Sequence, residues 1–293
     1  MSDINDSRAI ASSANHSHAI VVEGGAMRGI FASGVLDALM SVGYTQFDLA
    51  IGVSAGATNL SGLVAHRPGR SRRAIMEFAR QKEFFSPVRF LRGGHMTDVH
   101  WLWHYTHEQD PLTGLDPNTR FLATATHVET GAAHYLEVTE DNLHDAMVAS
   151  CAIPYLYREP VMVAGEAYVD GGVADSIPVR QAYELGARDI TVVLSQPLGF
   201  RKKEGQSWLL DKLFADSPAL VEALHRRATD YNASLDFIHN PPPDCRVHVI
   251  APPAEFAVSR LCMNEKKLSD GYAMGSVAAL QYLAQKHPTL SVA

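Results

Sequence analysis

The chain has 293 residues, of which 46% are hydrophobic, and its 25 basic and 32 acidic residues give a formal net charge of −7. This length suits one large α/β domain with its own core, and no apolar run reaches the roughly 20 residues that cross a bilayer. The basic residues are scattered and form no stripe that would neutralise phosphates, which argues against nucleic-acid binding.

Residues 1–17 are polar and lack the apolar core of a secretory signal, so we expect a flexible tail. Three cysteines occur at wide spacing, Cys151, Cys245 and Cys262, and suggest neither a disulfide framework nor a zinc site. We therefore expect a cytoplasmic protein.

The next two units each run from a strand through a turn into a helix. Residues 18–23 read as a short buried strand, and residues 28–43 have apolar side chains near one helical face. Residues 47–53 predict a second strand and residues 54–66 a second helix. This order predicts a parallel sheet covered by helices.

The middle of the chain is less regular. Residues 70–110 are mostly helical in pattern, and we interpret them as a cap-like insertion. Residues 120–128 and 134–139 are β-prone and flank a turn glycine, which predicts a hairpin. A helix is expected from about Asn142 to the residue before Pro154.

Alternation of strands and helices then resumes. Residues 160–172 predict two short strands, residues 178–187 a helix, and residues 189–196 a buried strand. The rest is rich in helix, with one more strand at 246–252 and a last amphipathic helix from about 264 to 286.

A short motif after the second predicted strand points to nucleophilic chemistry. Gly52-Val53-Ser54-Ala55-Gly56 fits the G-x-S-x-G pattern, in which a sharp strand-to-helix turn holds the serine hydroxyl outward. The alternative interpretation is an ordinary β-to-α turn with a serine N-cap. The context of the motif must decide between the two.

A glycine loop follows the first predicted strand, with the sequence Gly24-Gly25-Ala26-Met27-Arg28-Gly29. Dinucleotide binding is disfavoured, because Ala26 stands where the middle glycine of G-x-G-x-x-G belongs. We interpret the loop as an oxyanion hole, whose N–H groups hold the negative oxygen formed when Ser54 attacks an ester. In a parallel sheet both loops would lie at the carboxyl edge of the strands.

The third motif is Asp170-Gly171-Gly172, at the end of a strand-like run. The Asp170 carboxylate would lie at the end of a strand, and the two glycines after it would let the backbone pass close to a ligand. The alternative is a hairpin turn, since Asp-Gly is a common turn pair.

In this order, the three motifs resemble those of the bacterial patatin-like phospholipases, and the likeness runs from about residue 18 to 194. The resemblance implies a three-layer α/β/α fold in one large domain with a mostly parallel sheet. It also implies a Ser54–Asp170 dyad that cleaves carboxylic esters of lipids without a catalytic histidine. The implied oxyanion donors are the N–H groups of Gly25 and Ala26, together with Gly24.

The resemblance extends to the rest of the site and to the domain plan. Met27, Arg28, Gly29 and Ala55 would lie around the substrate. Residues 18–195 would form the catalytic domain, and residues 196–293 a helix-rich extension packed on it. Two departures from the family pattern are Ala26, where many relatives have a third loop glycine, and Asp175-Ser176, where asparagine is frequent.

The expected partner is a lipid or another acyl ester, with transient contact at a membrane surface. No cofactor is expected, and the absence of a loop of alternating acidic ligands leads us to expect activity without calcium. The sequence does not determine the head group, the acyl chain or the oligomeric state.

The proposed base raises a chemical difficulty. A carboxylate with a pKa near 3.9 is a weak base for a serine hydroxyl at neutral pH. Burial of Asp170 would raise its pKa, and a helix N-terminus at Ser54 would favour the alkoxide.

Several other interpretations remain open at this stage. Ser54, Asp170 and His248 occur in the chain order of a Ser-Asp-His esterase. A helix with His100, His104 and His107 on one face would offer zinc ligands. A catalytically idle module that binds acyl chains or a partner is disfavoured by the intact motifs.

Residues 84–107 are rich in aromatic side chains, which would form a rim for acyl chains, a membrane-facing patch or the core of the cap. They are Phe84, Phe85, Phe90, Trp101, Trp103 and Tyr105. Arg28 would either anchor the glycine loop or contact a phosphate head group, and we favour the anchoring role.

Overall fold

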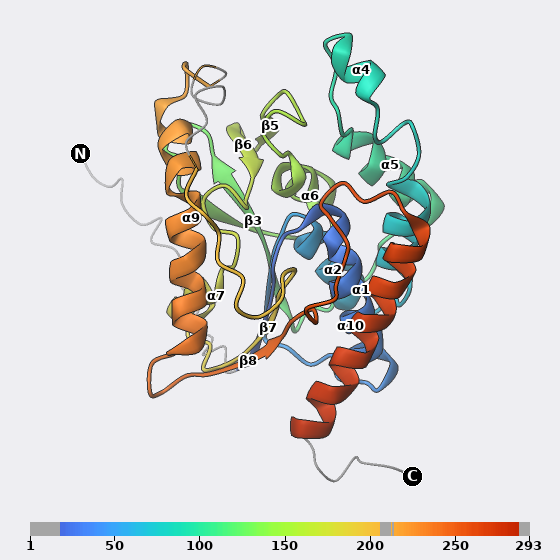
Figure 1. Ribbon diagram of the computed structural model, residues 1–293, viewed down its shortest axis with the longest axis vertical. Coiled ribbons are helices and arrows are strands. Elements are labelled where there is room, and N and C mark those ends of the chain that lie inside the picture. Colours follow the sequence, from blue (N-terminus) through green and yellow to red (C-terminus); the bar gives the residue numbers. More distant parts are fainter. Residues whose placement is uncertain (1–17, 206–211, 213, 287–293) are drawn as a thin grey trace, which may run out of the picture.

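A computed structural model describes residues 18–205, 212 and 214–286. A central eight-stranded sheet lies between two layers of helices (Figure 1), so the predicted three-layer α/β fold is confirmed. The predicted tail, residues 1–17, lies outside the described residues. No helix in the described part of the chain has both the length and the apolar character needed to span a membrane.

The sheet is mostly parallel, as predicted. Its parallel strands are, in spatial order, β3 (Arg120–His127), β2 (Leu49–Val53), β1 (His18–Val22), β7 (Asp189–Val193) and β8 (Arg246–Ile250). The antiparallel strands are β4 (Ala133–Glu137), β5 (Val161–Val163) and β6 (Glu166–Asp170). The predicted hairpin is formed by β3 and β4.

One edge of β3 brings two distant strands together. Residues 122–124 pair with β2 and β4 at once, whereas Ala125 pairs with β4 and β6 at once. Because a strand has only two edges, β2 and β6 lie end to end along the edge opposite β4. Val53 is the partner of Thr124 and Asp170 the partner of Ala125, so β2 and β6 finish at the same point.

Helices cover both faces of the sheet. One face carries α1 (Gly29–Ser41), α2 (Ala55–Val64), α6 (Leu143–Cys151) and α10 (Glu265–Lys286), and the other carries α7 (Val179–Glu184) and α9 (Pro218–His239) (Figure 1). Successive residues of a strand point to opposite faces. Ile20 and Val22 therefore pack in one core and Ala19 and Val21 in the other. This explains the uninterrupted apolar sequence of β1.

The cap-like segment consists of short helices around one buried carboxylate. Its elements are α3 (Arg70–Arg73), the π-helical turn η2 (Ala74–Phe78), α4 (Pro87–Leu91) and α5 (Val99–Gln109). Asp110 pairs with Arg67 and with Arg73, the latter at 3.1 Å, and its carbonyl oxygen accepts from Arg70 Nε at 3.0 Å. These bonds tie the end of the segment to its beginning.

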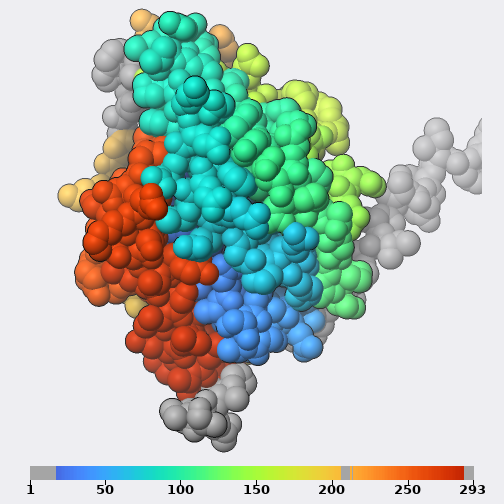
Figure 2. All heavy atoms as spheres, turned by 90° about the vertical axis from the view of Figure 1, so that its right-hand side faces the viewer, coloured from blue at the N-terminus to red at the C-terminus, as the bar shows by residue number. Residues whose placement is uncertain are grey.

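The last helix packs closely on the first. A Cβ atom added to Gly275 of α10 would lie 2.0 Å from the carbonyl oxygen of Phe31, and one added to Gly34 of α1 would lie 2.1 Å from that of Tyr272. Glycines on both helices thus let the two backbones touch. Figure 2 shows α10, in red, along the surface of the molecule beside the blue N-terminal part and the cyan cap.

Gly275→Ala should lower the free energy of unfolding by about 2 kcal/mol or more, because the new methyl group forces the two backbones apart. Val277→Ala is the control on the same helix: Val277 is 54% exposed, and its loss should change stability by less than about 0.5 kcal/mol. Urea unfolding followed by circular dichroism measures both. Equal stability of the two variants would contradict the close contact of α1 and α10.

Candidate active site

Ser54 stands on a strained turn between β2 and α2. Its backbone has φ 53° and ψ −126°, a conformation that side-chain-bearing residues rarely adopt. A Cβ atom on Gly52 would lie 2.4 Å from Ala57 Cα, and one on Gly56 would lie 2.3 Å from the carbonyl oxygen of Val22. The two glycines therefore let β1, β2 and α2 pack closely enough for this turn. The geometry is that of a nucleophile elbow.

Hydrogen bonds from α6 and β3 hold the elbow in place. The Ser54 N–H donates to Ser150 Oγ at 2.8 Å, and Ser150 Oγ donates to the carbonyl oxygen of Thr124 at 2.7 Å. Ser54 itself is 5% exposed. Its backbone amide is thus already used, and its hydroxyl is the group left to react.

Asp170 ends β6 beside this turn, and the chain after it passes very close to β3. A Cβ atom on Gly171 would lie 2.1 Å from the carbonyl oxygen of Thr124. The Gly172 N–H donates to Asp170 Oδ1 at 2.7 Å, whereas Oδ2 is buried and has no hydrogen-bond partner of ordinary geometry among the described residues. The Asp-Gly pair is therefore not the turn of a hairpin; it marks the end of a strand.

The environment of Asp170 favours a basic carboxylate. Burial raises its pKa, and this effect outweighs the opposing interactions with the Ser54 hydroxyl, the Gly172 N–H and the guanidinium groups of Arg227 and Arg260. The direction of the shift answers the difficulty posed by an ordinary aspartate, because a carboxylate with a raised pKa accepts a proton more readily.

The glycine loop presents free amide groups at its start. The N–H groups of Gly24, Gly25 and Ala26 donate no hydrogen bond to any residue in the described part of the chain, and neither does that of Ala55. Ala26 has φ 49° and begins the 3₁₀ turn η1 (Ala26–Arg28). A Cβ atom on Gly24 would lie 3.2 Å from Ser54 Cβ, so the loop runs directly beside the serine.

The later amides of the loop have other partners. The Met27 N–H donates to the carbonyl oxygen of Arg260 at 3.1 Å, the Arg28 N–H to that of Gly25 at 3.1 Å, and the Gly29 N–H to that of Ala26. These three residues thus shape the loop without offering an amide to a ligand.

Side-chain bonds with Ser195, just after β7, and with Tyr231 of α9 hold the loop in place. Arg28 donates to Ser195 Oγ at 3.0 Å, and Ser195 Oγ donates to the carbonyl oxygen of Gly24 at 3.1 Å. The buried carboxylate of Glu23 accepts from the Ser195 N–H at 2.6 Å and from the Tyr231 hydroxyl at 3.1 Å. Arg28 therefore anchors the loop, in agreement with the interpretation favoured from the sequence.

An apolar cavity opens on one side of Ser54. Among its lining residues are Met27, Ile75, Phe84, Leu102 and Trp103. Phe85 also lines it, whereas Phe90, Trp101 and Tyr105 do not, and Trp101 and Tyr105 stack on each other instead. Trp103 is buried and the other five aromatic residues of this segment are partly buried. Of the alternatives left open by the sequence, Phe84, Phe85 and Trp103 fit a rim for acyl chains, and Trp103 also belongs to the core.

A second, more polar cavity adjoins the first at Ser54, and Ala26 and Arg260 also line both. Asp170, Glu23 and the loop residues Gly24 to Ala26 line it, together with basic side chains from later in the chain: Lys202, Arg227 and Arg260. Ser54 lines both cavities. A substrate bound across Ser54 would thus have an apolar part on one side and a polar part on the other.

Cys151 is the other potential nucleophile in the apolar cavity. Its Sγ lies 3.5 Å from Thr58 Oγ1. Burial raises the pKa of the thiol to about 12, and the nearby Asp170 carboxylate adds to the shift. The side chain remains a thiol at neutral pH and does not compete with Ser54.

The structure contradicts the triad with His248. This residue lies on β8, three strands away from β2, which at the usual strand spacing is about 14 Å. Its Nε2 contacts Asp189 Oδ1 at 3.2 Å, and it lines neither cavity. The order of Ser54, Asp170 and His248 along the chain therefore did not indicate how far His248 lies from Ser54.

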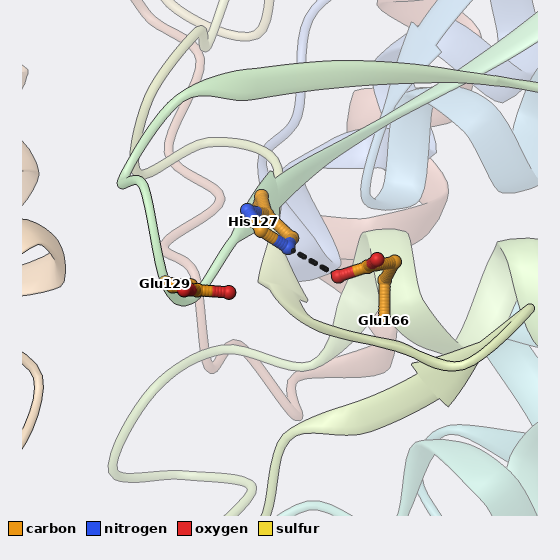
Figure 3. Close-up of side chains that lie close together, drawn as sticks. All are labelled: His127, Glu129 and Glu166. Carbon is orange, nitrogen blue, oxygen red and sulfur yellow. Dashed lines mark hydrogen bonds and ion pairs between the residues drawn. The ribbon is translucent and has the colours of Figure 1, made fainter.

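The three histidines of the alternative zinc site do not converge either. His100 packs edge-on against His144, and His104 pairs with Glu108. In the described ranges, a group of three potential ligands with atoms within 4.8 Å of one another occurs only at His127, Glu129 and Glu166 (Figure 3). His127 Nε2 lies 2.8 Å from Glu166, its Nδ1 lies 3.0 Å from Thr130, and none of the three lines a cavity beside Ser54.

The sequence interpretation missed Ser150, Ser195 and the three basic residues of the polar cavity. Lys202 follows β7, and a position after the carboxyl end of a parallel strand was a usable signal. Arg227 and Arg260 had none, because α9 and the segment before α10 approach the site only through the folding of the chain.

Comparisons with known proteins agree with the motifs. The family model "Patatin-like phospholipase" matches residues 20–183, and the model "Domain of unknown function (DUF6363)" matches residues 217–290. The uncharacterized protein YjjU of Escherichia coli (strain K12) is 36% identical over 279 residues, which is 91% of this chain and 77% of that protein. The crystal structure of VipD from Legionella pneumophila aligns with a TM-score of 0.48 and 12% identity, over 92% of this chain and 67% of that one.

Ala26→Gly should raise the free energy of unfolding, by up to about 1 kcal/mol, because glycine adopts the left-handed conformation without strain. Ala273→Gly, at an exposed position inside α10, should lower it by about 1 kcal/mol. Urea unfolding compares the two variants. If Ala26→Gly destabilises as much as Ala273→Gly, residue 26 does not have the positive φ described above.

Proposed function

Because the chain belongs to the patatin-like phospholipase family, a family of lipid ester hydrolases, we propose that it cleaves carboxylic esters of lipids with Ser54 as nucleophile and Asp170 as base. The observation that carries this proposal is that Ser54 and Asp170 line one cavity, at the point where β2 and β6 end. These two residues are separated by 115 positions in the sequence, and no structural need for a strained serine beside an incompletely bonded carboxylate is evident.

In the proposed first step, Ser54 Oγ attacks the ester carbonyl carbon while Asp170 takes the hydroxyl proton. The negative oxygen that forms is held by the free N–H groups of Gly24, Gly25 and Ala26. Asp170 then gives the proton to the departing alcohol, and the acyl group remains on Ser54. Water repeats the sequence on the acyl-enzyme and releases the acid.

The two cavities divide the substrate between them. The apolar cavity, lined largely by the cap segment, is suited to the acyl chain, and the polar cavity to the alcohol half of the ester. Burial of an acyl chain contributes about 0.8 kcal/mol for each methylene group. Chain binding would therefore supply much of the affinity and leave the polar side to select the alcohol.

The domain plan is also proposed on this basis. Residues 18–195 contain both members of the dyad and the glycine loop, and we assign them to catalysis. The extension from residue 196 supplies α9 and α10, which pack on opposite faces of the same sheet. A cytoplasmic location, with transient contact at a membrane surface, fits three unpaired cysteines and a lipid substrate.

Ser54→Ala and Asp170→Asn should each lower kcat/KM for a short p-nitrophenyl ester by at least about 10³-fold, because the first removes the nucleophile and the second its base. Hydrolysis rates, together with labelling by a fluorophosphonate, measure the effect. The control is His248→Ala, which should retain both labelling and turnover.

Loss of turnover in His248→Ala, with its fold intact by circular dichroism, would contradict the dyad. A wild-type protein that is neither labelled nor active on any acyl ester would overturn the proposed hydrolase and favour a module that only binds acyl chains.

The rate should fall at low pH as Asp170 takes up a proton. Because burial raises the pKa of this carboxyl, the acidic limb of kcat/KM for a neutral ester should have its midpoint above about 4, the value of an ordinary aspartate. Release of fatty acid between pH 3 and 8 measures the limb. A midpoint at or below 4 would contradict a buried base.

A second buried carboxyl must be separated from this effect. Asp175 accepts hydrogen bonds from Tyr135 and from the Ile177 N–H, and burial raises its pKa to about 6. The profile is therefore repeated with Asp175→Asn. A limb that persists in this variant belongs to Asp170, and one that disappears belongs to Asp175.

A further inference from the structure

Three basic side chains face Ser54 and Asp170 across the polar cavity. They come from three separate parts of the chain: Lys202 from the segment after β7, Arg227 from α9, and Arg260 from the segment before α10. All three lie outside residues 20–183, which match the family of lipid hydrolases, and two lie within residues 217–290, which match a domain of unknown function. Their presence at the site is therefore a feature of the C-terminal part of this protein.

The direct contacts of Lys202 and Arg227 are with neutral groups, although the carboxylates of Glu23 and Asp170 lie near enough to attract Arg227. Lys202 Nζ lies 4.1 Å from the centre of the Tyr231 ring and donates to Ser176 Oγ at 3.4 Å. Arg227 Nε donates to the carbonyl oxygen of Gly172 at 2.6 Å. Within the part of the chain that the structure describes, none of the three forms an ion pair with a carboxylate within 4.0 Å.

The cations also repel one another. Burial, followed by the charges of Arg227 and Arg260, lowers the pKa of Lys202 to about 7, and burial and Arg260 lower the pKa of Arg227. The nearby carboxylate of Glu23 is buried and already bonded to the Ser195 N–H and the Tyr231 hydroxyl. An anion in the cavity would relieve this repulsion and find donors on several sides.

We propose that Lys202, Arg227 and Arg260 form a phosphate subsite on the alcohol side of Ser54, so that this protein prefers acyl esters whose alcohol carries a phosphate group. The inference rests on the proposed hydrolase function and specifies its substrate class. Guanidinium groups bind phosphate oxygens through charge-assisted hydrogen bonds, and a lysine adds a point charge. Convergence of three cations from different directions suits a tetrahedral phosphate better than a planar carboxylate.

The position of the subsite determines which half of the substrate it binds. The acyl chain would occupy the apolar cavity, whereas Lys202 and Arg227 line only the cavity that also contains Asp170; Arg260 lines both cavities and so lies where they meet. A phosphate there is attached to the alcohol that leaves after acyl transfer.

The test compares two substrates that differ in one group: a monoacylglycerol phosphate and the neutral monoacylglycerol with the same chain, both below their micelle concentrations. The quantity measured is the ratio of their kcat/KM values. The wild type should favour the phosphate ester by at least about tenfold, since a hydrogen bond to a charged group contributes roughly 1.5–3 kcal/mol. Arg260→Gln and Lys202→Gln should each lower this ratio by about tenfold.

Neighbouring exposed residues provide matched controls. Lys203 adjoins Lys202 and is exposed, and Arg226 adjoins Arg227 but turns outward to pair with Glu222 at 3.2 Å. Neither lines the polar cavity. Lys203→Gln and Arg226→Gln change the net charge by the same amount and should leave the ratio as in the wild type. A ratio that falls equally in these controls would assign the effect to overall charge and overturn the subsite.

Inorganic phosphate distinguishes a substrate group from a free anion. It should inhibit hydrolysis of the neutral ester competitively, and more weakly in Arg260→Gln. Inhibition by phosphate without any preference for the phosphate ester would mean that the cavity takes a free anion, which overturns the proposal.

The neutral ester separates this inference from the proposed function. If the wild type but not Ser54→Ala cleaves the neutral ester, and the ratio is near one in all variants, the hydrolase stands and the phosphate subsite is wrong. If the wild type cleaves neither ester, the proposed hydrolase function is wrong, and the phosphate subsite that rests on it is overturned as well.

Discussion

β3 pairs along one edge with β2 as far as Thr124 and with β6 from Ala125 onwards, and this shared edge determines where the site lies. β2 runs parallel to β3 and β6 runs antiparallel to it, so their carboxyl ends meet. Ser54 follows one end and Asp170 is the last residue of the other. Positions 52, 56 and 171 require glycine, because backbone atoms of neighbouring segments lie so close to them that a Cβ atom has no room.

The electrostatic state of Asp170 results from two opposing effects. Burial raises its pKa, whereas the Gly172 N–H and the nearby guanidinium groups lower it. A carboxylate with full hydrogen bonding would be too weak a base, and one without any stabilisation would stay protonated at neutral pH. One Asp170 oxygen is bonded to an amide and the other has no partner of ordinary geometry, and the net effect of burial and these contacts is a raised pKa.

The two sides of the serine are built by different parts of the chain. The cap between residues 70 and 110 lines the apolar side, and the segments after β7 bring cations to the polar side. The sheet and its two loops supply the proposed reactive groups, which would need a rigid frame. The substrate walls come from helices that pack on this frame, so their side chains can differ without disturbing the elbow.

The sequence by itself determined the order of strands and helices, because their apolar patterns and glycine turns are local. It also indicated Ser54, Asp170 and the glycine loop as candidates, because each motif is a short run with its own backbone requirements. It did not determine which distant residues meet. His248 has the right order for a triad and the wrong strand, while Arg227 and Arg260 have no motif and reach the site through α9 and the segment before α10. Burial and charge at Asp170 likewise arise only in the folded chain, since both depend on contacts with β3, Ser54, Arg227 and Arg260, which are distant in the sequence.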